Sequence, residues 1–120
     1  MIPIFIHYPK CTTCQRAAAW LRANGIDFTE RNIVTDNPKA AEISAWVARS
    51  DREVTKFFNT SGLRYKALGL KDRVKTTPPD QLIELLATEG MLVKRPVLVT
   101  DSTVLVGFKE AEWSAALLGK

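Results

Sequence analysis

The sequence is poor in the residues that build metal centres and disulfide scaffolds. Its 120 residues include only two cysteines and one histidine. A structural zinc site usually takes four ligands, and secreted scaffolds spread several cysteines along the chain to close long loops. Cys11 and Cys14 lie so close together that a bridge between them would restrain little chain. We therefore predict a redox pair and no metal, with a zinc site that uses His7, or two inert thiols, as the alternatives.

Long apolar runs and a strong excess of one charge are also missing. No stretch approaches the roughly 20 apolar residues of a membrane span, and residues 1–7 lack the positive region that opens a signal peptide. We therefore expect a cytoplasmic protein without membrane contact. The formal net charge of +4 suits an anionic substrate or partner, but it is too small and too scattered to predict direct binding of nucleic acid.

The pattern of apolar and polar residues predicts an α/β protein. Apolar residues make up 46% of the chain, enough for one core, so we expect a single domain over residues 1–120. The predicted order is β-α-β, then a helical insertion at about 37–90, then β-β-α. We expect strands at 2–7 and 26–34 around a helix at 12–24. The insertion is expected to hold a helix with Pro38 in its first turn, one or two short helices at 51–70 interrupted at 59–62, and a helix opened by residues 77–79. A hairpin of strands 97–100 and 104–107 and a last helix around Trp113 are expected to follow.

The two cysteines fall where the first predicted strand meets the first predicted helix. The unpaired N–H groups of a helix start favour a negative charge, and they lower the pKa of a thiol there from about 8.5. Cys11 is at that start, and Cys14 lies one turn deeper on the same face. We therefore predict Cys11 as the nucleophile and Cys14 as the thiol that resolves a mixed disulfide. A phosphatase loop of the Cys-x5-Arg type would need arginine where Ala17 stands.

Several segments, in order and over essentially the whole chain, resemble the arsenate reductase (ArsC)/Spx/MgsR family. The resemblance implies a thioredoxin-like fold with a helical insertion. It also implies a soluble thiol redox protein of that family. The segments are HYPKCTTC at 7–14, FNTSG at 58–62, MLVKRPVLV at 91–99 and VGF at 106–108.

The resemblance also implies roles for single residues. Cys11 matches the catalytic or redox-active cysteine of the family. Arg95 and Pro96 match an Arg-Pro pair whose proline is cis and lies beside that cysteine, and Arg95 would hold an anion or the thiolate with a charge that does not titrate. His7 matches a histidine that precedes the catalytic cysteine in arsenate reductases.

The chain departs from the arsenate reductases at the residues that hold the oxyanion. Those enzymes use three arginines, of which one matches Arg95. The second falls on Lys66, with Arg64 two places away, and the third falls near residues 107–108, where there is no cation and Lys109 is the nearest. A lysine does not replace the two-pronged hydrogen bonding of an arginine, so we expect poor turnover of arsenate.

Two functions are therefore predicted. The first is a thiol-dependent reductase that acts on a small thiol, a disulfide or an oxyanion without a bound cofactor, and takes electrons from an external thiol such as glutathione or a thioredoxin-type protein. The second is a redox-sensing regulator that binds RNA polymerase, with Cys11 and Cys14 as its switch. The presence of Cys14 is more typical of the Spx/MgsR branch.

Overall fold

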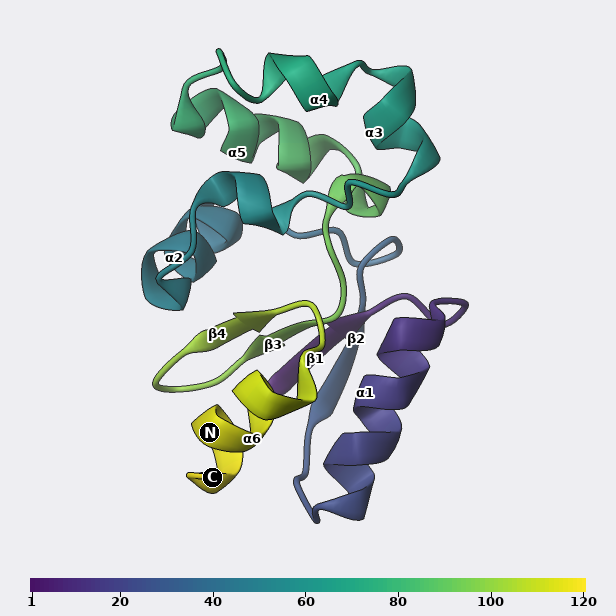
Figure 1. Cartoon of the computed structure of the whole chain (residues 1–120), viewed down its shortest axis with the longest axis vertical. Helices are drawn as coiled ribbons and strands as arrows, with labels where there is room; N and C mark the ends of the chain where they lie inside the picture. Colours follow the sequence, from purple (N-terminus) through teal and green to yellow (C-terminus); the bar gives the residue numbers. More distant parts are fainter.

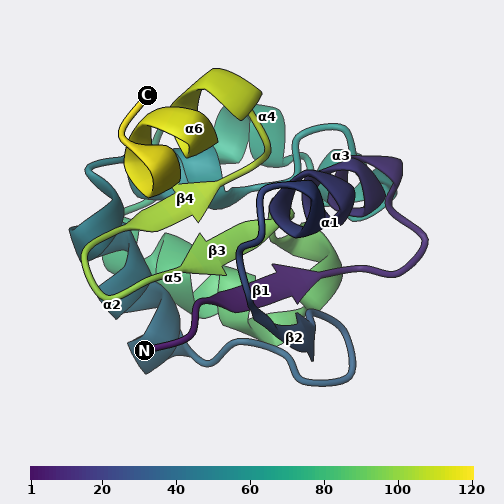
Figure 2. The same cartoon turned by 90° about the horizontal axis from the view of Figure 1, so that it is seen from below.

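The computed structural model describes residues 1–120, and a mixed four-stranded sheet lies at its centre in the order β2-β1-β3-β4 (Figures 1 and 2). Strand β1 (Ile4–His7) pairs in parallel with β2 (Thr29–Asn32). It pairs antiparallel with β3 (Val97–Val99), which forms the predicted hairpin with β4 (Val104–Val106). This sheet confirms the predicted α/β, thioredoxin-like fold.

Helices cover both faces of the sheet. Figure 2 shows α1 (Thr12–Ala23) and α6 (Glu110–Leu118) side by side on one face. The segment between β2 and β3 lies on the other side and carries the remaining helices (Figure 1). These are α2 (Ala40–Ser50), the 3₁₀ turn η1 (Val54–Phe57), α3 (Leu63–Ala67), α4 (Leu70–Arg73), α5 (Pro79–Thr88) and the 3₁₀ turn η2 (Gly90–Leu92). No helix is long and apolar enough to cross a membrane.

Alternation along the strands divides the core into two parts. Phe5 and Leu98 lie opposite each other in the sheet and point towards α1 and α6. The neighbouring pair, Ile6 and Val97, points the other way, towards the helices between β2 and β3. The part under α1 is small because that helix buries only Cys14, two alanines and a leucine. Strand β1 ends at His7, and the loop at 8–11 leads from it into the first turn of α1.

Strand β2 is shorter than the predicted 26–34. At its start, the N–H of Ile26 donates to the carbonyl of Leu21, 3.0 Å away, which closes the end of α1 instead of a strand ladder. At its end, the side-chain oxygen of Asn32 accepts from the N–H groups of Val34 and Thr35, at 2.8 and 3.1 Å. Such side-chain to backbone bonds turn the chain and compete with sheet pairing.

The prediction that Pro38 lies in the first turn of a helix is wrong. Helix α2 begins at Ala40 with Lys39 as its N-cap. The carboxylate of Glu42 accepts the N–H of Lys39 at 3.1 Å, which places the helix start after the proline. The predicted interruption at 59–62 separates η1 from α3, and the helix predicted to open at 77–79 is α5.

Candidate active site

Cys11 is the N-cap of α1, where the loop after β1 enters the helix. Its N–H donates to the carbonyl of Tyr8 at 2.9 Å, and its own carbonyl accepts the N–H of Gln15 at 3.0 Å. The Cys11 sulfur accepts the N–H of Cys14 at 3.3 Å. A polar acceptor at an N-cap satisfies one of the free donors of the first turn, and a thiolate does so better than a thiol.

This environment lowers the pKa of the Cys11 thiol below its ordinary value of 9.0. Partial burial alone would raise the pKa. Hydrogen bonds from the side chain and the N–H of Cys14, the positive charge of Arg95 and the N–H of Thr13 together outweigh that effect. Cys11 therefore has more thiolate at neutral pH than an ordinary cysteine.

Cys14 is the opposite case, because its side chain is only 2% exposed. Burial raises the pKa of the Cys14 thiol to about 12, although a hydrogen bond that the Cys14 sulfur accepts from the backbone of Tyr8 acts in the other direction. The hydrogen bond with Cys11 and the charge of Cys11 raise it further. Both cysteines are free thiols in the structure. One thiol of the pair is thus prepared to attack, and the other is held protonated behind it.

Arg95 approaches Cys11 from the segment before β3, where the peptide bond between Arg95 and Pro96 is cis. Its Nη1 donates to the carbonyls of Met91 and Val93, at 3.3 and 3.4 Å. The guanidinium carbon lies 5.3 Å from the ring centroid of Tyr8, a cation–π distance. The Nε atom is buried and has no hydrogen-bond partner. Arg95 is therefore fixed on one side and keeps donor capacity free.

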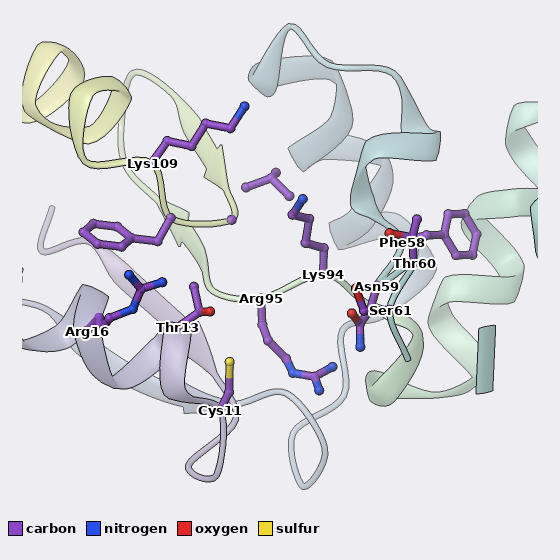
Figure 3. Close-up of a pocket in the computed structure, with 13 residues that line it drawn as sticks. Cys11, Thr13, Arg16, Phe58, Asn59, Thr60, Ser61, Lys94, Arg95 and Lys109 are labelled. Carbon is purple, nitrogen blue, oxygen red and sulfur yellow. The ribbon is translucent and has the colours of Figure 1, made fainter. Parts of the chain in front are cut away.

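A cavity of about 410 Å³ opens beside Cys11 (Figure 3). Four of its lining side chains are cationic, and none is acidic. None of these four cations takes part in an ion pair, although arginines elsewhere in the chain are paired with glutamates. The cavity is therefore a site of unneutralised positive charge around a reactive thiol, which favours an anion. Its lining residues are Cys11, Thr13, Arg16, Phe58, Asn59, Thr60, Ser61, Lys94, Arg95, Val106, Gly107, Phe108 and Lys109.

The predicted catalytic residues meet at this site. Cys11 and Arg95 line the cavity, and Cys14 lies beneath Cys11. Pro96 is buried next to Arg95, where its carbonyl accepts the N–H of Gly107 at 2.8 Å. No group of three or more His, Cys, Asp or Glu side chains that could hold a metal ion lies together in the chain.

The other predicted anion-binding residues do not line the cavity. Arg64 makes a two-pronged ion pair with Glu89, at 2.8 and 2.9 Å. Lys66 lies exposed on α3. The His7 ring stacks on Phe5, with centroids 5.2 Å apart and the planes at 22°. An anion-binding role for these residues stays a prediction.

Sequence reasoning missed three cations of the cavity. Arg16 stands next to Ala17, the position that excludes a phosphatase loop, and it lies one helical turn after Thr13. Both Thr13 and Arg16 line the cavity. Their spacing of three along α1 is the signal that could have found it. Lys94 and Lys109 lie on the opposite wall, from the segment before β3 and from the residue that caps α6. The cavity thus holds more positive charge than the sequence predicted.

Comparison with known proteins gives the family. The model of the ArsC family matches residues 6–116. This chain belongs to the ArsC family. The uncharacterised protein YusI of Bacillus subtilis is 41% identical over 109 residues, which make up 91% of this chain and 92% of YusI. The regulatory protein MgsR of the same organism is 28% identical over 108 residues, 90% of this chain and 84% of MgsR.

Solved structures of ArsC-related proteins have the same fold. The crystal structure of a putative ArsC family related protein from Bacteroides fragilis superposes with a TM-score of 0.93 at 51% identity, and the match covers 95% of this chain and 96% of that one. That of a possible arsenate reductase from Streptococcus mutans gives 0.83 at 42% identity, with 90% and 92% covered. The family therefore includes both reductase-like and regulatory relatives.

Proposed function

We propose that this ArsC-family protein is a thiol-dependent reductase of small anionic disulfides, with Cys11 as nucleophile and Cys14 as resolving thiol. One observation carries the proposal: the Cys11 thiol, whose pKa is lowered, opens into a cavity with four unpaired cations and no carboxylate. Carboxylates around the thiol would repel an anionic substrate, whereas the cations of this cavity attract it. The volume of about 410 Å³ is in the range of small-molecule sites.

The reaction consists of two exchanges at the Cys11 sulfur. The Cys11 thiolate attacks one sulfur of the substrate disulfide, forms a mixed disulfide and releases the other half as a thiolate. The positive charge of Arg95 stabilises the negative charge at the attacking and leaving sulfurs. Cys14 then gives its proton to water and attacks the Cys11 sulfur, which breaks the mixed disulfide and releases the second half as a thiolate. The substrate has gained two electrons, and an external thiol reductant of the glutathione or thioredoxin type returns the Cys11–Cys14 disulfide to two thiols.

A single-turnover experiment tests this sequence. The reduced protein is mixed with 5,5′-dithiobis(2-nitrobenzoate), and the released thiolate is followed by absorbance while mass spectrometry follows the protein. We expect two equivalents of thiolate and an intramolecular disulfide. Cys14→Ser should release one equivalent and retain the other half on Cys11. Cys11→Ser should lack the fast release, and a Cys11→Ser variant that reacts like the wild type would overturn the proposal.

Arsenate is expected to be a poor substrate. The cavity offers two arginines and two lysines, and there is no cation at residues 107–108, near which the third arginine of the arsenate reductases is expected to fall. Lysines do not reproduce the paired hydrogen bonds that arginine gives to an oxyanion. Turnover of arsenate with glutathione at about 1 s⁻¹ or faster, an ordinary enzyme rate, would contradict the preference for disulfides.

A second candidate is a redox-sensing regulator that binds RNA polymerase. The similarity to the regulatory protein MgsR over 90% of this chain favours it. In that case the Cys11–Cys14 disulfide changes binding, and turnover is unnecessary. A pull-down with purified bacterial RNA polymerase, with the protein reduced or oxidised, separates the two functions when it is run beside the turnover assays. Redox-dependent capture without turnover supports the regulator, and turnover without capture supports the reductase.

A further inference from the structure

Gly107 lies directly after β4 in a position that only glycine adopts easily, with φ of +72°. Its backbone is held at both ends. Its N–H donates to the carbonyl of Pro96 at 2.8 Å, and its carbonyl accepts the indole N–H of Trp113 at 2.9 Å. The open face of this glycine is therefore fixed next to the chain that carries Arg95.

The Lys94 side chain lies across that open face. A Cβ added to Gly107 would come within 2.8 Å of Cε of Lys94, and within 3.7 Å of its Cδ and Nζ. Any side chain at position 107 would thus push Lys94 away. The backbone of Lys94 is itself fixed, because its N–H donates to the carbonyl of Phe57 at 2.7 Å. The Lys94 side chain can therefore lie in this position only because residue 107 has no side chain.

Lys94 and Arg95 point to different parts of the cavity. In Figure 3, the Lys94 side chain points towards the wall that carries Lys109, and Arg95 extends on the side of Cys11. The charges agree with this division, since Arg95 is among the causes that lower the pKa of Cys11 and Lys94 is not. Lys94 is thus placed to act on a bound molecule rather than on the thiol.

We propose that Lys94, held over Gly107, together with Lys109, forms a second anion site that selects substrates with a carboxylate away from the reacting sulfur. The inference rests on the proposed reductase function and names the substrate class: small disulfides that carry a carboxylate on the attacked half. Arg95 acts at the reacting sulfur, and Lys94 binds the distant carboxylate. Neither lysine forms an ion pair with a carboxylate of the chain, so both ammonium groups are available to the substrate.

Two chromogenic disulfides separate the effect on the substrate from the effect on the thiol. 5,5′-Dithiobis(2-nitrobenzoate) carries a carboxylate on each half, and 2,2′-dithiodipyridine is neutral. Lys94→Gln should slow the reaction of Cys11 with the carboxylate probe by about three- to tenfold, the range of a partly exposed ion pair and its steering effect. The rate with the neutral probe and the pH dependence of Cys11 alkylation should stay unchanged. Lys94→Arg should keep most of the wild-type rate.

A matched control removes the same charge elsewhere. Lys71 is an exposed lysine on α4, outside the cavity, so Lys71→Gln changes the net charge equally and should leave both rates near the wild type. The inference is overturned if Lys94→Gln slows both probes equally or neither, or if Lys71→Gln slows the carboxylate probe as much. If wild-type Cys11 reacts with neither probe, the reductase function itself is wrong, which is a different outcome.

Discussion

The difference in pKa between the two thiols predicts that a short pulse of iodoacetamide at pH 7 alkylates Cys11 almost alone. The reagent reacts with thiolates, so the rate at each cysteine follows its thiolate fraction. Burial raises the pKa of Cys14 to about 12, whereas the hydrogen bonds of the α1 N-terminus and Arg95 bring that of Cys11 below 9.0. Both values come from the position of each sulfur relative to the first turn of α1.

The expected selectivity follows from these values. At pH 7, the thiolate fraction is on the order of 10⁻⁵ for a pKa of about 12 and at least about 10⁻² for one below 9.0, a ratio of at least about 10³. A more basic thiolate is also a better nucleophile. With a Brønsted slope of about 0.4–0.5, a pKa higher by about three units makes the Cys14 thiolate about 15- to 30-fold more reactive than the Cys11 thiolate, which offsets part of that ratio. The net preference for Cys11 is therefore at least about 30-fold. The burial of Cys14 hinders access of the reagent and increases the preference.

The assay is peptide mapping by mass spectrometry after reaction times from seconds to hours. Cys14→Ser should keep the fast alkylation, and Cys11→Ser should lose it. The unfolded protein in denaturant is the control, because both thiols then have ordinary pKa values and should react at similar rates. Alkylation of Cys14 in the folded protein within about fivefold of the rate at Cys11 would refute the assigned roles, since the ionisation argument predicts at least about 30-fold.

Two further predictions concern charges near the site and between elements. Arg95→Gln removes a charge that favours the Cys11 thiolate, so the midpoint of the pH–alkylation profile of Cys11 should move up, and an unchanged midpoint would contradict the role of Arg95. Hydrogen bonds from Arg31 lower the pKa of Glu42 to about 2, so this pair stabilises the fold above pH 4.5 and loses its contribution as the pH falls towards 2. Because the Glu42 side chain is 37% exposed, Glu42→Gln should lower the free energy of unfolding by only about 1 kcal/mol at pH 7. Urea titrations should show that this difference vanishes near pH 2, and a constant difference would contradict the pairing.

The position of the two cysteines at a helix start was predictable because it depends on local order. The break at Pro9 after a strand and the helix-forming run after Cys11 place the thiol at a helix start without any distant contact. The hairpin before α6 was predictable for the same reason, since three turn residues separate two apolar runs. Local signals were insufficient at β2, where the side chain of Asn32 ends the strand before the apolar residues Ile33 and Val34.

The cavity was not predictable in full because segments far apart in the sequence form its walls. The turn at Asn59 meets the chain before β3 through the bridge between Phe58 and Val93. This contact places Lys94 opposite α1, and no periodic pattern in the sequence predicts the contact. The missing arginine near residues 107–108 suggested a weaker anion site, whereas the structure uses the space above Gly107 for Lys94.

For the proposed disulfide exchange, the unequal burial of the two thiols also predicts which step is slow. The pKa of Cys14 is raised first by burial and only in part by the charge of Cys11. Formation of a mixed disulfide removes that charge, so the pKa of Cys14 falls, but burial still opposes its thiolate. We therefore expect burial to slow the attack by Cys14, so that the mixed disulfide accumulates on a sulfur that opens to the cavity. An external thiol then competes with Cys14 for the same sulfur. A reductase turns over by either route, whereas a switch needs the internal disulfide, so the rate of Cys14 attack relative to that of the external thiol distinguishes the two functions.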